Sequence, residues 1–150
     1  MSFQPPARIA ACAELLTVLR SWFRAAAPEE ACALLLGRRV GSLWRLERLW
    51  PCRNAWSEPS ERRQCFAIDP REQLLAQKWA RGLGLELLGS AHSHPASAPL
   101  PSPHDLALTA SPALMLIGGP PQPELGSELR LWWLEDPPAA PRPLEWTMDP

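Results

Sequence analysis

Proline is distributed unevenly along this chain of 150 residues, and its distribution restricts the second half more than any other feature. Thirteen of the nineteen prolines lie at or after Pro95. Proline fixes φ near about −65° and has no backbone N–H, so it is tolerated at the ends of helices and strands and in the loops between them. Residues 95–150 are therefore expected to form short elements separated by proline-containing loops.

Two longer helices are expected in the first half of the chain. Apolar residues recur at steps of three and four over residues 8–26, which predicts an amphipathic helix that Pro28 ends. The stretch DPREQLLAQKWARGLG opens with Asp69 as N-cap and Pro70 at the first helical position, and Gly82 follows its last turn. This second stretch carries a start signal and a stop signal, so it predicts a second helix.

Short apolar or alternating runs bounded by glycine, proline or polar residues predict the strands. These runs are ACALLLG, SLWRLERLW, QCFAI, LELLGSA, ALMLIG, LRLWWLE and, as an edge strand, RPLEWTM. The first two are joined by the turn GRRVGS and predict a hairpin. Because strands and helices interleave without a long linker, the sequence predicts one α/β (α+β) domain over residues 1–150, with helices packed on a mixed sheet.

Composition excludes several classes of protein. Fifteen basic and sixteen acidic residues give a net charge of −1, so no long-range field draws the chain to nucleic acid or to a membrane. No apolar run reaches the roughly 18 residues of a membrane helix, and Glu14 interrupts the early stretch that a signal peptide would need. The four cysteines form no C-x-x-C pair, which favours reduced, packed thiols. We therefore expect a cytoplasmic protein without a nucleic-acid or membrane partner.

All three histidines lie in one proline-rich segment, GSAHSHPASAPLPSPHDLAL. His92 and His94 end a predicted strand, where side chains two residues apart project from the same face roughly 7 Å apart. Both imidazoles can therefore reach one ion. Zinc binds histidine nitrogen and carboxylate oxygen, and a catalytic zinc site keeps three protein ligands. The pair indicates a metal site, and the alternative is a pair of solvated or core imidazoles.

Asp105 is the candidate third ligand, because the loop after His94 is long enough to fold back and present its carboxylate. The same residue has a structural alternative: Ser102 as N-cap, Pro103 at the first position and an acid in the first turn predict a short helix. The two interpretations are compatible if the helix tip points at the metal. His104 would then point away, either solvated or beside a ligand.

A metal site needs a base before it can hydrolyse a bond, because a carboxylate must take the proton from the attacking water. Glu29 and Glu30 stand at the entrance of the apolar run ACALLLG, an unusual place for charge unless one of them faces a polar site. The alternative is that both are solvated at the end of the strand. From the residues alone, both alternatives stay open.

Taken together, these motifs resemble the JAMM, or MPN-domain, zinc metalloproteases. The family places a glutamate before a CGLLLG-like strand and continues with H-[ST]-H-P. Seven residues separate the second histidine from a serine, and two residues separate that serine from an aspartate. Here HSHP, Ser102 and Asp105 keep that spacing, and RNAW, FAIDPRE and GLELLGSAHSHP extend the resemblance over residues 8–135. Two positions depart from the pattern: Ala33 replaces a glycine and Ala91 an aromatic residue.

The resemblance implies a fold and a set of roles. The fold would be the MPN/JAMM, or cytidine-deaminase-like, fold, a mixed and mostly antiparallel β-sheet flanked by helices. One Zn²⁺ per chain would be bound by His92, His94 and Asp105. Glu30, rather than its neighbour, would activate the water, and Ser102 would help to hold the oxyanion of the intermediate. The implied reaction is hydrolysis of an amide bond, often an isopeptide bond.

The resemblance also implies a substrate class. Members that cleave ubiquitin chains carry extra loops, whereas only 45 residues follow Asp105 here, which is typical of the compact bacterial branch. Such a peptidase would act at the C-terminal tail of a ubiquitin-like sulfur-carrier protein or its adduct. The main alternative is a catalytically silent MPN scaffold or protein-binding module. A zinc nucleobase deaminase would need H-x-E and P-C-x-x-C, which the sequence lacks.

Overall fold

The computed structural model describes residues 5–109, 112–135 and 140–148. Its strands are β1 (Arg8–Ala11), β2 (Cys32–Val40), β3 (Leu43–Cys52), β4 (Glu86–Ser93), β5 (Ala113–Gly118), β6 (Leu129–Leu134) and β7 (Arg142–Met148), and its helices are α1 (Ala13–Ala26), α2 (Pro70–Gly82), α3 (Pro103–Leu108) and the 3-10 turn η1 (Pro59–Glu61). The strand order is β1–β3–β2–β4–β5–β6–β7, and β7 pairs with β1 to close the sheet.

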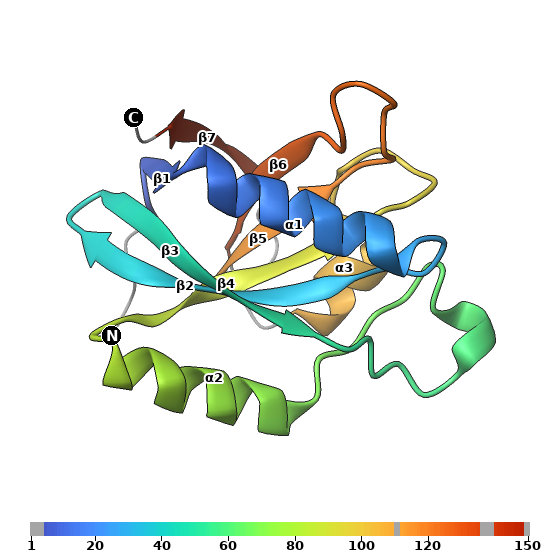
Figure 1. The fold of residues 1–150 in the computed structure, drawn as a ribbon, viewed down its shortest axis with the longest axis horizontal. Helices are drawn as coiled ribbons and strands as arrows, with labels where there is room; N and C mark the ends of the chain where they lie inside the picture. The colour runs from blue at the N-terminus through green and yellow to red at the C-terminus, as the bar shows by residue number, and fades with distance from the viewer. Residues whose placement is uncertain (1–4, 110–111, 136–139, 149–150) are drawn as a thin grey trace.

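The expected mixed α/β architecture is confirmed. The sheet, however, is closed by the pairing of β1 with β7, whereas an open sheet flanked by helices was expected. The pairs β1–β3, β1–β7 and β4–β5 are parallel, and the remaining four pairs are antiparallel. Helix α1 lies across one face of the sheet, and α2 lies across the opposite face of β2, β3 and β4 (Figure 1). The sheet is therefore covered on both sides where β2 and β4 run through its middle.

Strand β2 is apolar along its first half because both of its faces are covered. Leu35 packs into the cluster that includes Leu19 and Phe23 of α1, whereas Leu34 packs with Ala76 of α2. A strand buried on both faces gives a continuous apolar run instead of an alternating one. The run ACALLLG is thus explained by the two helices that sandwich it, and each buried CH₂ group contributes about 0.8 kcal/mol.

Residues 8–11 form strand β1 instead of the first turn of a helix. Ile9, Ala10 and Ala11 are buried, and β1 pairs in parallel with both β3 and β7. Helix α1 begins only at Ala13. The prediction of a helix over residues 8–26 is therefore wrong at its start, because pairing with two distant strands overrides the local periodicity.

Two other strand predictions need correction. The segment QCFAI, residues 64–68, lies in the loop between β3 and α2 and pairs with no strand in the described part of the chain. The segment RPLEWTM is strand β7 as predicted, but it is not an edge strand, since it pairs with β6 on one side and β1 on the other. Both corrections concern long-range pairing, which neighbouring residues do not encode.

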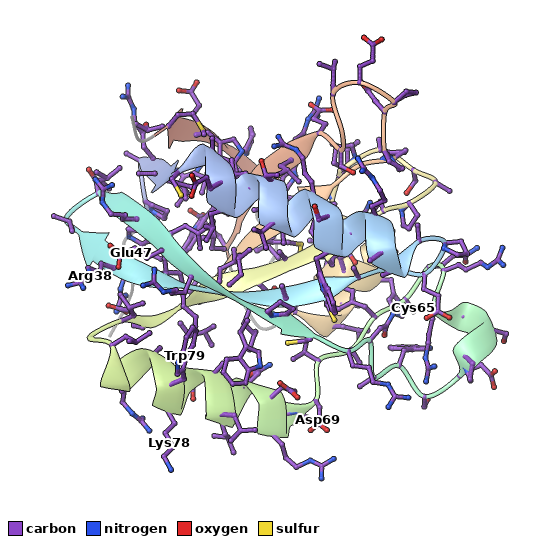
Figure 2. All side chains as sticks on the ribbon, viewed as in Figure 1. Arg38, Glu47, Cys65, Asp69, Lys78 and Trp79 are labelled. Atoms are coloured by element: carbon purple, nitrogen blue, oxygen red, sulfur yellow. The ribbon has the colours of Figure 1, made fainter. Side chains whose placement is uncertain are left out.

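Helix α2 confirms its predicted start. The Asp69 side chain accepts a backbone N–H of the first turn, and the helix ends at Gly82, one residue later than expected. Figure 2 shows Asp69 at the beginning of α2, Lys78 pointing away from the sheet and Trp79 pointing toward it, where its ring lies 5.6 Å from that of Trp50. None of the described helices is long and apolar enough to span a bilayer.

Strand β4 occupies the middle of the sheet and ends at the candidate site. It pairs with β2 on one side and with β5 on the other. Strand β2 in turn forms the predicted hairpin with β3. At its end, His92 lies between Cys32 of β2 and Ile117 of β5. Gly89 allows the close approach of β5, because a Cβ there would lie 2.3 Å from the carbonyl oxygen of Leu114. His92 therefore lies on, and His94 directly after, a strand that is paired on both sides.

Candidate metal centre

The two histidines at the end of β4 and the aspartate of α3 converge on one point. The Nε2 atoms of His92 and His94 are 3.2 Å apart, and each lies 3.1 Å from Oδ2 of Asp105. Zinc bonds of about 2.0–2.1 Å in tetrahedral geometry place ligand atoms roughly 3.3 Å from one another. The spacing of these three atoms therefore fits a zinc ion, and all three side chains are buried.

The tautomer of His94 gives a second reason why this donor set fits a cation. Its Nδ1 lies 2.9 Å from the carbonyl oxygen of Ala98, which can only accept, so Nδ1 carries the proton. In the neutral imidazole, the lone pair of Nε2 then faces the carboxylate of Asp105. Two acceptors in contact inside a protein require a shared proton or a cation between them. The fixed tautomer thus leaves the correct nitrogen free to bind metal.

The predicted helix cap at Asp105 is present, and the same carboxylate faces the two histidines that are predicted to bind metal. Ser102 Oγ accepts the backbone N–H of Asp105 at 3.0 Å, and the backbone N–H of Ser102 donates to Asp105 Oδ2 at 2.9 Å, which forms a capping box. The same Oδ2 faces His92 and His94. The cap of α3 therefore holds the carboxylate oxygen that points into the cluster.

The environment shifts the pKa of each of the three side chains. Burial raises the pKa of Asp105, but the hydrogen bonds to His92 and His94 outweigh it and hold that pKa well below its usual range. Burial lowers the pKa of His92. Burial also opposes the charged form of His94, yet its bonds to Asp105 and to the Ala98 carbonyl raise its pKa overall. These shifts favour the ionised form of Asp105 and the neutral form of His92, which are the forms that bind metal, whereas His94 would have to lose its proton when a cation binds.

Glu30, which lies two residues before the start of β2, completes the cluster. Its side chain is 5% exposed, and one of its oxygens lies within 4.8 Å of the ligand atoms of His92, His94 and Asp105. Burial raises the pKa of Glu30 to about 8, and Oε1 has no hydrogen-bond partner among the described residues. Glu29 is only half-buried. Of the two glutamates that the sequence left open, the structure brings Glu30 to the site.

Ser93, between the two histidines, attaches β4 to the chain beside Glu30. Its Oγ accepts the buried N–H of Ala31 at 2.8 Å, and its own N–H donates to the Ala31 carbonyl at 3.0 Å. Threonine at this position would supply the same acceptor oxygen. Glu30 and the histidines are thereby fixed to one another through neighbouring residues.

We expect Ser93→Ala to destabilise the protein by about 1–3 kcal/mol, because it leaves the buried N–H of Ala31 without an acceptor. Ser93→Thr keeps a hydroxyl and should retain most of the stability. Urea unfolding of both variants checks this expectation. A Ser93→Ala protein as stable as the wild type, or a threonine variant as weak as alanine, would contradict it.

Ser102 and His104 are the two predicted neighbours of the ligands. Ser102 Oγ acts as the cap acceptor of α3, which leaves its hydroxyl proton free to donate, and its oxyanion role stays a prediction. His104 is half-buried: its ring packs edge-on against Trp56 at 4.9 Å, and its Nε2 is buried without a hydrogen-bond partner among the described residues. His104 thus belongs to a wall next to the site.

That wall encloses a cavity of about 500 Å³ that sequence analysis did not predict. Among the described side chains that line it, Asp105 is the single carboxylate, and no described lysine or arginine takes part. Phe66 lines it too, and its ring stacks on His92 at 4.4 Å with an interplanar angle of 22°. Because Phe66 and Asp105 both line it, the cavity begins directly beside the cluster. The QCFAI segment, which contributes Phe66 to this wall, predicts a strand and not a cavity.

These features define an α/β domain with a buried metal-type site of two imidazoles and two carboxylates at the end of a sheet. Residues 13–135 match the family described as prokaryotic homologs of the JAB domain. The chain therefore belongs to this JAB, or JAMM/MPN, family, as a compact bacterial member.

Individual relatives agree with this assignment. A probable TtuB-protein conjugate cleaving protease from Thermus thermophilus is 36% identical over 92 residues, which is 61% of this chain and 57% of the relative. The match thus spans little more than half of that protein. A solution structure from Desulfitobacterium hafniense has a TM-score of 0.83 at 32% identity and covers 94% of this chain and 92% of its own. One from Salinibacter ruber has a TM-score of 0.69 at 26% identity, covering 93% and 91%.

Proposed function

We propose that this chain is a JAMM-type zinc metallopeptidase that hydrolyses an amide or isopeptide bond at the C-terminal tail of a ubiquitin-like, sulfur-carrier-type protein or its adduct. The observation that carries the proposal is the buried group of Glu30, His92, His94 and Asp105, whose ligand atoms all lie within 4.8 Å of one another. Burying four ionisable side chains together is costly unless a cation compensates them. Membership of the JAB family and the protease named among its relatives support a hydrolase.

In this proposal, His92, His94 and Asp105 hold the ion, and Glu30 acts as the general base. A zinc ion bound there would supply Lewis acidity and would lower the pKa of the attacking water to about 7. Glu30 accepts a proton on a carboxylate oxygen and later donates it to the leaving amine. In the metal-free chain burial raises the pKa of Glu30 to about 8, and a cation held by the three neighbouring side chains would favour the carboxylate form that accepts the proton.

Ser102 is proposed to stabilise the negative charge that develops on the scissile carbonyl oxygen. Its Oγ already accepts the N–H of Asp105, which fixes the side chain in one orientation and leaves the hydroxyl hydrogen available to the substrate. A preorganised donor of this kind contributes more than a mobile one, because it needs no reorganisation during the reaction. The cap of α3 is therefore proposed to serve both the fold and the chemistry.

The cavity beside the cluster supports a peptide tail as substrate. Asp105 belongs to both the cluster and the cavity, and the other lining side chains, such as Trp56, Phe66 and Leu108, carry no formal charge. An uncharged, extended segment such as one that ends in Gly-Gly fits this lining, because it would leave no buried charge unpaired. The relative from Thermus thermophilus is named for cleaving conjugates of TtuB, and we extend that substrate class to this chain.

Zinc content and cleavage test the proposal together. The purified protein is expected to hold about one zinc per chain and to cleave a carrier protein whose Gly-Gly terminus is linked to a lysine peptide. Asp105→Asn removes a charged ligand and should lower zinc affinity at least tenfold and cleavage at least a hundredfold. Asp69→Asn is the matched control, because asparagine also caps α2 and Asp69 is not among the clustered side chains.

The outcomes are decisive in either direction. A wild-type protein without bound metal, or an Asp105→Asn variant that cleaves as fast as the wild type, overturns the proposed function. A protein that binds the carrier tightly, holds zinc and releases no product would instead be the silent binding module. Loss of cleavage in both Asp105→Asn and Asp69→Asn would point to a general effect on folding, which circular dichroism detects.

A further inference from the structure

The side chain of Asn54, just after β3, uses its whole hydrogen-bonding capacity inside the loop that leads to α2. Its Nδ2 donates to the carbonyl oxygens of Glu30 at 3.0 Å and Cys65 at 2.9 Å. Its Oδ1 accepts the backbone N–H groups of Trp56 at 3.1 Å and Ala67 at 3.3 Å. An amide side chain offers two donors and two acceptor sites, so all of them are occupied here.

These four bonds replace a strand ladder that the loop does not have. Residues 53–69 form no strand, yet the two legs of the loop lie side by side, with the N–H of Ala55 bonded to the carbonyl of Ala67 at 2.8 Å. Asn54 connects both legs to the chain before β2. Backbone groups in a part-buried loop need partners, and one amide side chain supplies four of them.

Glu30 depends on this loop for its own backbone. It lies two residues before Cys32, the first residue of β2, and the bonds to β4 at this point are made by Ala31 and not by the backbone of Glu30 itself. Its N–H donates to the carbonyl of Arg62 at 2.8 Å, and its carbonyl accepts from Asn54. Both backbone groups of the glutamate that faces the cluster are therefore held by residues of the loop between β3 and α2.

The same loop carries the ring that supports a candidate ligand. Phe66 stacks on His92 and lines the cavity, and its neighbours in the chain, Cys65 and Ala67, are both bonded to Asn54. Movement of Asn54 would therefore displace both the backbone of Glu30 and the ring of Phe66 that stacks on His92.

We propose that Asn54 is the positioning residue of the site: through its four hydrogen bonds it places Glu30 against the metal ligands and sets the cavity wall at Phe66. This inference rests on the proposed function for its consequence in catalysis. Asn54 touches no reacting atom, so its effect is exerted through Glu30. A displacement of about 1 Å at a reacting group can cost a hundredfold in rate.

The test replaces the two donors without changing the shape of the side chain. Asn54→Asp keeps an oxygen for Trp56 and Ala67 but places a second oxygen against the carbonyls of Glu30 and Cys65. Gln64→Glu is the matched control, because it adds the same charge to an exposed side chain of the same loop. Asn54→Ser is a second variant that removes the two amide donors and leaves only one shorter hydroxyl, without adding charge, in case the aspartate variant does not fold.

We expect kcat on the carrier adduct to fall about ten- to a hundredfold in both Asn54 variants, with KM changed less than threefold and zinc content unchanged. Gln64→Glu should retain the wild-type kcat. An unchanged kcat in the Asn54 variants, alongside a loss of cleavage in Glu30→Gln, overturns the inference and leaves the proposed function intact. A raised KM with normal kcat also overturns it, because Asn54 would then shape only the cavity.

Hydrogen–deuterium exchange without substrate separates this inference from the proposed function. The segments around residues 29–33 and 62–67 should exchange at least tenfold faster in the Asn54 variants, while the peptides of β5 should not change. Unchanged exchange in both segments overturns the linkage even if the protein proves to have no peptidase activity. Faster exchange over the whole chain would assign Asn54 to general stability instead and overturn the positioning role.

Discussion

Replacing Glu30 with glutamine is expected to lower kcat about 10²- to 10⁴-fold while the zinc content and the fold stay unchanged. Glutamine has the shape of glutamate but cannot accept a proton, and general acid–base catalysis contributes a factor of that size. Glu30 faces the three candidate ligands without belonging to their close contacts, which are 3.1–3.2 Å apart. The metal should therefore remain bound in the variant.

The neighbouring glutamate provides the control for this experiment. Glu29 is half-buried and is not among the clustered side chains, so Glu29→Gln should cleave the carrier adduct at close to the wild-type rate. Rates are measured per zinc-loaded chain, so that differences in metal content do not enter. Equal rates for the wild type and Glu30→Gln would remove Glu30 from the mechanism, and loss of zinc in Glu30→Gln would make it a ligand instead.

The structure also shows which parts of the site the sequence could predict. The positions of His92 and His94 followed from the two-residue period of a strand, and β4 does end there. The capping box of Ser102 and Asp105 was predictable from a spacing of three residues, and α3 has it. Such features depend on residues close together in the chain, whose geometry the backbone fixes locally.

What the sequence could not predict depends on pairing between distant segments. Residues 8–11 continue the helical periodicity of α1, but β3 and β7 take them as a parallel strand. QCFAI has the composition of a strand, yet Asn54 binds the backbone on both sides of Phe66 and holds it in a loop. In each case a long-range partner satisfied the backbone in a way that local propensity does not specify.

Glu30 shows the same limit at the level of chemistry. Two adjacent glutamates before an apolar strand are equivalent in composition, and the residues alone left open whether either faces a site. The choice between them follows from burial, because β4 and the loop between β3 and α2 enclose Glu30 and leave Glu29 half-exposed. The resemblance to a family selected the same residue by its distance from the cysteine, which is a pattern and not a physical cause.

The metal-free protein should become less stable as pH rises from about 5.5 to 8.5, and Glu30 should be the main reason. Burial raises the pKa of Glu30 from 4.5 to about 8, so between these values the folded chain binds a proton that the unfolded chain has lost. Stability falls with rising pH wherever the folded state binds more protons. Over this range the loss attributable to Glu30 is on the order of 3 kcal/mol.

Urea unfolding in the presence of a chelator, at pH 5.5 and at pH 8.5, measures this effect. Relative to the wild type, Glu30→Gln should gain about 3 kcal/mol on going to the higher pH, because glutamine does not ionise. Glu29→Gln should show no such gain, because Glu29 is not among the clustered side chains. A gain that does not depend on pH would mean that the Glu30 carboxyl is solvated in the folded protein. A solvated carboxyl would remove burial as the reason for the raised pKa of Glu30, while its distance from the ligand atoms would be unaffected.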